Sequence, residues 1–190
     1  MNIYRIIILY FLLLSNACAN QSSDLQEILS TGLKDNANST HRTKLRKIIK
    51  WPDSCEETFS FPTAGFVIFK KDVNNYIAQI VCTYGSYQGM SLFYKINTSG
   101  NNPIISKISF PTRNNSKKHL SEIWGNVLTS STVDKFHILN LFSGYGHCGT
   151  LTTYDLSADI PKIIKLKTQD NCDLKPAIRD PEKWKSINVN

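Results

Sequence analysis

Four cysteines constrain the fold of this chain more than any other feature of its sequence. Cys55, Cys82, Cys148 and Cys172 form an even set, and no two of them make a C-x-x-C motif. In an oxidising compartment such a set predicts two disulfides, whereas a zinc site or a redox-active pair would need closer spacing. Of the three pairings open to four cysteines, Cys55–Cys82 and Cys148–Cys172 are favoured because each joins neighbouring segments. Each bridge would then stabilise the fold by about 3 kcal/mol.

The N-terminus has the pattern of an export signal. A basic start that ends at Arg5 precedes an uninterrupted apolar run over residues 6–14. The run suits the hydrophobic region of a signal peptide and is shorter than the ~20 residues that span a bilayer. Residues 17–19, Ala-Cys-Ala, form an A-x-A cleavage site. The sequence therefore predicts removal of a signal peptide, residues 1–19, and a protein that is secreted or periplasmic.

Cys18 leaves a second route of processing open. A cysteine that follows the apolar run and is preceded by Ala17 resembles the bacterial lipobox, although Ser15 stands where that box prefers leucine. On this route Cys18 would carry lipid and become the new N-terminus of an outer-membrane lipoprotein. Both routes remove Cys18 from the disulfide count.

Residues 20–52 are expected to form a helical and linker segment before a β domain over residues 53–190. Short helices are predicted over residues 23–32 and 43–50, on either side of a polar, Asn-rich stretch over residues 35–40. Pro52 ends the second helix.

The β domain is rich in Val, Ile, Thr, Tyr and Phe, the residues that favour strands. Strands are predicted over residues 64–70, 76–82, 90–96, 104–110, 136–142, 150–156 and 161–167. A polar loop is expected over residues 114–118, and a short helix is one interpretation of residues 119–128. The predicted fold is mainly β: an antiparallel two-unit β meander or sandwich, preceded by a short helical N-terminal segment.

The two units come from an internal similarity at an offset of about 60 residues. The aligned pairs are Tyr76 with Phe136, Gly89 with Gly149, and Tyr94 with Tyr154. They predict a duplicated unit over residues 76–110 and 136–168, and coincidence is the alternative explanation.

Two glycine–tyrosine loops at equivalent positions of these units form the candidate binding surface. Residues 82–89 are CTYGSYQG, and residues 143–149 are SGYGHCG. Glycine permits tight turns, and tyrosine offers an apolar ring with a polar tip. We expect a recognition surface for a peptide, a glycan or a partner loop, made by Tyr84, Tyr87, Tyr145 and His147. Alternatively, the glycines only serve the turns and the tyrosines pack over the disulfides.

Three motifs extend from these loops to the C-terminus: Cys82-x-x-Gly85-Ser86-Tyr87, Gly146-His147-Cys148-Gly149, and Cys172 followed by Trp184. In these motifs the chain resembles a family of bacterial periplasmic proteins, the domain of unknown function eleven-seventy-six. The resemblance covers roughly residues 55–187. It departs from the family at His147, where Asp is expected, and at Ser86, where Ala is commoner. It implies an exported bacterial protein and no assigned activity.

Catalytic motifs do not stand out in the sequence. Neither the G-x-S-x-G of many hydrolases nor the phosphate-binding G-x-x-x-x-G-K-[ST] occurs. A disulfide-bonded Cys148 cannot act as a thiolate beside His147. The sequence therefore predicts no catalytic residue, no metal and no cofactor, and an enzyme such as a hydrolase is the least favoured class.

The formal charge of +7 bears on the partners of the chain. Nucleic acid is not expected for an exported protein. The favoured function is an interaction module, an inhibitor or immunity-type protein with a protein partner in the cell envelope. The alternative is an envelope accessory protein that binds anionic polymer or a membrane surface through a basic cluster. The residues of this cluster are Arg42, Lys44, Arg46, Lys47 and Lys50.

Overall fold

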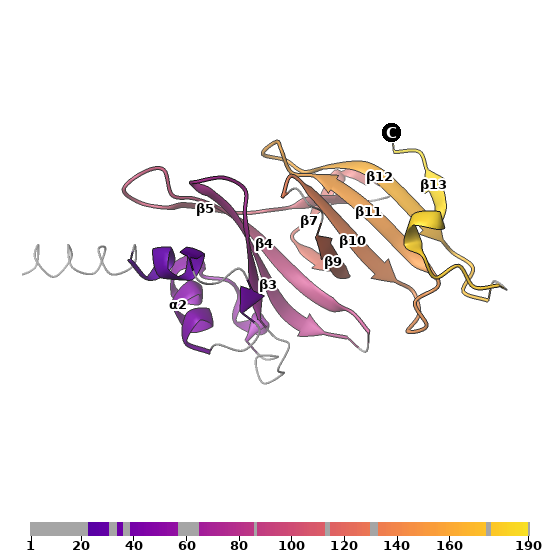
Figure 1. Ribbon diagram of the computed structural model, residues 1–190, viewed down its shortest axis with the longest axis horizontal. Helices are drawn as coiled ribbons and strands as arrows, with labels where there is room; N and C mark the ends of the chain where they lie inside the picture. The colour runs from indigo at the N-terminus through magenta and orange to yellow at the C-terminus, as the bar shows by residue number, and fades with distance from the viewer. Residues whose placement is uncertain are drawn as a thin grey trace, which may run out of the picture.

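Figure 1 shows a computed structural model of the protein, which describes residues 23–30, 34–35, 39–56, 65–85, 87–112, 115–129, 133–173 and 176–189. The predicted signal peptide and Cys18 lie outside these residues. The chain is mainly β and antiparallel, with short helices before the sheets, as the sequence predicts. No helix in the described ranges is long and apolar enough to cross a membrane.

The first sheet has the strand order β1-β2-β3-β4-β5, and β8 also pairs with β4. Its strands are β1 (Lys34–Asp35), β2 (Phe66–Lys70), β3 (Asn75–Tyr84), β4 (Gly89–Asn97), β5 (Ile104–Lys107) and β8 (Glu122–Trp124). The turn between β2 and β3 is held by Asp72, whose carboxylate accepts hydrogen bonds from the backbone N–H groups of Asn74 and Asn75 at 2.9 Å. This side-chain turn fixes the register of the hairpin.

The second sheet has the order β13-β12-β11-β10-β9. Its strands are β9 (Asn126–Thr129), β10 (Lys135–Leu141), β11 (Gly149–Asp155), β12 (Lys162–Gln169) and β13 (Lys185–Ile187). A smaller sheet pairs β6 (Phe110–Thr112) with β7 (Asn115–Leu120). Single 3₁₀ turns occupy η1 (Asp53–Cys55) and η2 (Pro181–Lys183).

Helices cover one face of the first sheet. Residues 23–30 and α2 (Ser39–Ile49) are helical, and they lie beside β3 and β4 in Figure 1. Leu25, Ile28 and Leu45 are buried in one core with Ile68 and Ile80 of the sheet. The helical segment therefore shares a hydrophobic core with the β domain.

The second core lies between the two sheets and is built on aromatic rings. Phe93 packs edge-to-face against Phe110 and Phe136, with ring centroids 5.2 and 5.8 Å apart. Phe110 also packs against Tyr154 at 4.9 Å, and burial raises the pKa of the Tyr154 hydroxyl to about 12. The molecule thus has three layers: helices, first sheet and second sheet. The central strands of the first sheet are buried on both faces, which explains the nearly continuous apolar sequence of β3.

The two sheets repeat one strand pattern. β2, β3 and β4 begin at Phe66, Asn75 and Gly89, and β9, β10 and β11 begin 60 residues later in each case. Consecutive strands pair as a meander in both sheets. The offset agrees with the alignment in the sequence, whereas a common origin of the two units stays a prediction.

Three parts of the chain differ from the sequence-based expectations. Residues 115–118 of the expected polar loop over residues 114–118 belong to strand β7. Residues 119–128, for which a helix is one interpretation, contain the end of β7, all of β8 and most of β9. The predicted strand over residues 104–110 is divided between β5 and β6, which belong to different sheets. In addition, α2 begins at Ser39, inside the expected linker, and β1 pairs with β2.

Two disulfides close the fold. Cys55 in η1 is bonded to Cys82 in β3, and Cys148 is bonded to Cys172 beyond the end of β12. This is the pairing that the sequence favours. The first bridge attaches the chain that leaves the helices to the first sheet, and the second attaches the chain after β12 to the loop before β11.

Candidate binding surface

The two glycine–tyrosine loops lie side by side at one end of the β domain. Gln88, at the end of the first loop, accepts a hydrogen bond from the backbone N–H of Leu141 at 2.8 Å and donates one to the Asn140 carboxamide at 3.3 Å. Both partners belong to β10, directly before the second loop. In Figure 1 the loops leave the lower ends of β3 and β10. Gln88 therefore connects the hairpin of the first sheet to that of the second.

Each loop is shaped by its own backbone hydrogen bonds. The N–H of Gly85 donates to the carbonyl oxygen of Gln88 at 2.7 Å and closes a tight turn after β3. In the second loop the N–H of Phe142 donates to Cys148 at 3.1 Å, and Gly146 has a φ of 74° that glycine adopts without strain. Between these anchors, Tyr87 and Tyr145 are exposed.

Tyr145 is the most exposed aromatic residue of the described chain, with 84 % of its surface accessible. Its ring stacks on the imidazole of His147, with centroids 5.9 Å apart and an angle of 30° between the planes. His147 in turn donates from Nε2 to the carbonyl oxygen of Cys172. The His147 imidazole thus packs against one face of the Tyr145 ring, and its hydrogen bond attaches the loop to the second disulfide.

Tyr87 and Trp124 continue this surface across the first loop. Tyr87 is 42 % exposed, and its ring lies against Gly144: a Cβ atom at position 144 would be 3.6 Å from Cδ1 of Tyr87. Trp124 is 46 % exposed, and its Cζ3 would be 3.5 Å from a Cβ atom at position 85. Trp124, Tyr87, Tyr145 and His147 therefore lie on neighbouring segments, and we call this set of residues the aromatic ridge.

The ridge matches part of the surface predicted from the sequence. The structure places Tyr87, Tyr145 and His147 together, and Tyr145 does not pack over a disulfide. Tyr84 pairs through its backbone with Gly89 at the end of β3, and its side chain lies outside the description.

The binding surface predicted from the sequence does not include Trp124. The sequence carried a signal for it in β8, where the apolar and buried Ile123 lies between Glu122 and Trp124, which are exposed. This alternation is the mark of a strand with one buried face, and it places Trp124 on the outer face.

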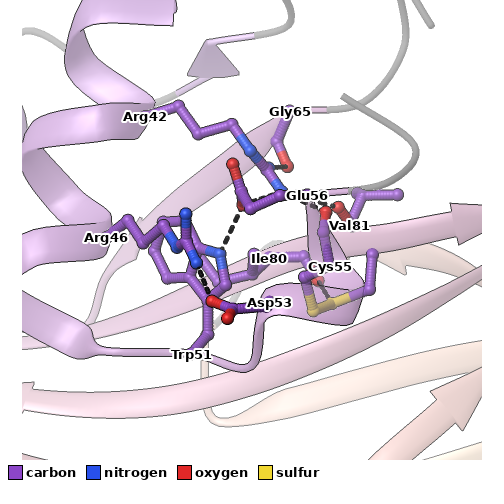
Figure 2. A network of polar contacts seen from close by, with 10 residues as sticks. Arg42, Arg46, Trp51, Asp53, Cys55, Glu56, Gly65, Ile80 and Val81 are labelled. Atoms are coloured by element: carbon purple, nitrogen blue, oxygen red, sulfur yellow. Dashed lines mark hydrogen bonds and ion pairs between the residues drawn. A yellow bond between two sulfur atoms is a disulfide. The ribbon is translucent and has the colours of Figure 1, made fainter. Parts of the chain in front are cut away.

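The basic cluster is divided between buried, paired and exposed residues. Arg42 is only 2 % exposed, and Figure 2 shows its guanidinium inside a polar network. It donates hydrogen bonds to the carbonyl oxygens of Gly65 at 3.0 Å and Cys55 at 2.9 Å, and it forms an ion pair with Glu56 at 3.1 Å. Arg42 is therefore not exposed to an anionic surface, and its charge stabilises the junction between α2 and the first sheet.

Trp51 completes this network. Its indole Nε1 donates to the same Glu56 carboxylate at 2.6 Å, and the Arg42 guanidinium carbon lies 5.2 Å from the centre of its ring. The carboxylate and the ring together compensate the buried charge, as burial of a guanidinium requires.

Two further members of the cluster are paired within the chain. Lys44 contacts Glu27 at 2.8 Å and Asp24 at 3.0 Å. These hydrogen bonds raise the pKa of Lys44, and the Lys44 ammonium lowers the pKa of Glu27. Arg46 forms an ion pair with Asp53. Lys47 and Lys50 are exposed at the end of the helix.

The side chains of the ridge are suited to non-covalent contacts with a partner. It offers ring faces, two phenol hydroxyls and an indole N–H, and its side chains carry no formal charge while His147 is neutral. Within the described ranges, no group of three His, Cys, Asp or Glu side chains could hold a metal ion.

Comparisons with known proteins add no relative: no protein-family model, no curated protein and no solved structure matches this chain. Its resemblance to the domain of unknown function eleven-seventy-six stays a prediction.

Proposed function

We propose that this chain is an exported interaction module that binds a protein partner through the aromatic ridge. The observation that carries the proposal is the exposure of Tyr145, Tyr87 and Trp124 on three segments that meet at one end of the two sheets. Tyrosine and tryptophan are the residue types that dominate the binding energy of protein interfaces, and they cluster as these do. Their position on short loops of a rigid double sheet presents them with little loss of entropy on binding.

A protein partner fits the ridge better than a polyanion does. The ridge is uncharged, whereas binding to wall polymer or anionic lipid requires accessible cations. Three of the five basic residues proposed for such binding are buried or paired within the chain. An inhibitor or immunity-type module, which inserts loop side chains into a partner, would use a neutral aromatic surface of this kind.

Export is part of the proposal. The apolar run over residues 6–14 and the cleavage site after it predict secretion, and two disulfides are typical of an oxidising compartment. The intact mass of protein recovered from the producing cell should lack residues 1–19. A lipid adduct on Cys18 would assign the lipoprotein route, and a full-length protein in the cytosol would contradict export.

The binding proposal is tested by capture from envelope extract, combined with a probe of the ridge. Trp124 is the exposed one of the three tryptophans, since Trp51 and Trp184 are each 3 % exposed. Fluorescence quenching by acrylamide therefore reports mainly on the ridge. A stoichiometric protein partner that stays bound at about 1 M salt and shields Trp124 from acrylamide supports the proposal.

Two results would contradict it. One is binding to isolated cell wall or to anionic vesicles that is lost as salt is added, because this behaviour belongs to surface charges. The other is a partner that leaves the quenching of Trp124 unchanged, which would place the contact elsewhere on the molecule.

A further inference from the structure

We propose that the protein has a second site, a cleft on the inter-sheet face of the first sheet, which takes a small, neutral, hydroxyl-rich ligand such as a short saccharide. The cleft has a volume of about 500 Å³, within the roughly 300–1,000 Å³ typical of small-molecule sites. It lies at the start of β3 and the end of β4, whereas the ridge lies at the opposite ends of these strands. The ten residues of β3 separate the two sites by about 30 Å, so this proposal stands independently of the ridge.

The base of the cleft is apolar. Ile77 of β3 and Leu156 of the second sheet line it and are both buried. Ile104, on the edge strand β5, also lines it and is largely exposed. A ligand would therefore meet aliphatic surface on one side, as the C–H face of a sugar ring requires.

Two lysines bridge the sheets beside this base. Lys95 donates from Nζ to the carbonyl oxygens of Ala158 at 2.8 Å and Asp159 at 3.1 Å. Lys71 contacts the carboxylate of Asp134 at 2.9 Å. These contacts join the first sheet to loops of the second and hold the walls of the cleft in place.

The charges around the cleft nearly cancel. Lys71 is paired with Asp134, and Lys95 lies 3.5 Å from the carboxylate of Asp159. Asp72 also lines the cleft, and hydrogen bonds from Asn74 and Asn75 lower the pKa of its carboxyl. Because every ammonium group has an acidic neighbour, the cleft has no surplus positive charge for an anion.

The rim carries amides and hydroxyls that can exchange hydrogen bonds with a polyol. The side-chain amide N–H of Asn97 donates to Oδ1 of Asn75 at 2.7 Å. The side-chain oxygen Oδ1 of Asn97 accepts a hydrogen bond from the hydroxyl of Ser99 at 2.6 Å. Ser106 and Ser157 line the two opposite walls and are exposed. An apolar base with a neutral rim of donors and acceptors matches the amphipathic surface of a sugar and fixes the ligand class.

The test is an NMR titration of the disulfide-bonded protein with N,N′-diacetylchitobiose, a neutral disaccharide. We expect saturable shifts of the amides of Asn97, Ser106 and Ser157, while those of Tyr87 and Tyr145 stay in place. Glucose 6-phosphate should bind at least ~10-fold more weakly, because the cleft has no unpaired cation.

Matched substitutions inside and outside the cleft test whether the ligand binds there. Ser106→Tyr should fill the opening and weaken binding by at least ~10-fold, whereas Ser109→Tyr, at an exposed serine outside the cleft, should bind as the unmodified protein does. Ser157→Tyr repeats the blockade from the other wall if Ser106→Tyr lowers the melting temperature.

Four results would overturn the proposal. They are the absence of saturable shifts, shifts confined to the ridge, unchanged affinity in a folded Ser106→Tyr or Ser157→Tyr variant, and tighter binding of the phosphate ester than of the disaccharide. Apart from shifts confined to the ridge, none of these results bears on protein binding by the ridge, whose probe is Trp124.

Discussion

The ring of Tyr87 lies against Gly144, so that a Cβ atom at position 144 would be 3.6 Å from it. This contact joins the hairpin loop of the first sheet to that of the second. The aromatic ridge consequently crosses the boundary between the two sheets, and its shape depends on how they pack. A partner bound there would contact both halves of the molecule.

Replacing Arg42 with methionine should destabilise the protein by about 1–3 kcal/mol, the usual cost of leaving buried hydrogen-bond partners unsatisfied, because Arg42 is buried while Glu56 is 26 % exposed. The change removes one hydrogen-bond donor from the Glu56 carboxylate, which keeps the Trp51 indole, and one from each of the carbonyl oxygens of Gly65 and Cys55. Urea unfolding followed by circular dichroism measures the loss. Lys47→Met, on an exposed residue of the same helix, should change stability by less than ~0.5 kcal/mol. Equal stability of the two variants would refute the structural role of Arg42.

Gly149→Ala should be among the most damaging small substitutions in the chain. A Cβ atom there would be 2.2 Å from the carbonyl oxygen of Asn140, and the residue has a φ of 153°. Strand pairing between β10 and β11 must open to admit it, so we expect a loss above about 2 kcal/mol. Gly100→Ala is the control, because its nearest neighbour would be an ordinary 3.7 Å away. A tolerated Gly149→Ala would mean that this pairing is wrong.

The two disulfides should contribute similarly to stability. They join residues 27 and 24 positions apart, and loops of this size predict about 3 kcal/mol each from restriction of the unfolded chain. Serine replacement of each pair, measured by urea unfolding, checks the expectation. A proteolytic map that links Cys82 to Cys148 would instead contradict the pairing itself.

Acid should weaken the attachment of the C-terminal segment. Hydrogen bonds from Lys167 and Lys165 lower the pKa of Glu182 from 4.5 to about 2. Because the folded pKa is depressed, this carboxylate stabilises the fold above pH 4.5 and loses its contribution as the pH falls toward 2. Glu182→Gln should therefore lower the melting temperature at neutral pH, and its difference from the unmodified protein should shrink between pH 4.5 and 2. A difference that is constant with pH would exclude this ion pair as its cause.

The sequence predicts most of the fold because its strongest signals are local. The turn at Asp72 and the alternation from Ile163 to Lys167 mark hairpins that the structure contains. The helix considered over residues 119–128 is wrong, because the polar residues there conceal two short strands that pack inward through Ile123 and Val127 and pair in different sheets. Such partners are set by tertiary packing, which a single strand does not encode.

The candidate site was predictable only in part for the same reason. Glycine and tyrosine composition identified the two loops, but the position of Trp124 depends on the pairing of β8 with β4. For the basic cluster, the sequence suggested a surface residue where the structure has a buried one. Its charge pattern suggested a solvent-exposed contact surface, and nothing local indicated that Glu56 and the backbone near Cys55 would enclose Arg42.

The central claim is that the aromatic ridge binds the partner, and the most direct test is to measure capture and melting temperature on the same variants. Tyr145→Ala and Trp124→Ala should each weaken capture by about 1–3 kcal/mol while the melting temperature hardly changes. Val73→Ala, at a residue that is 76 % exposed in the turn at the opposite end of β3, should alter neither quantity. Unchanged capture by both ridge variants, or a fall in melting temperature that accounts for the lost capture, would contradict the account.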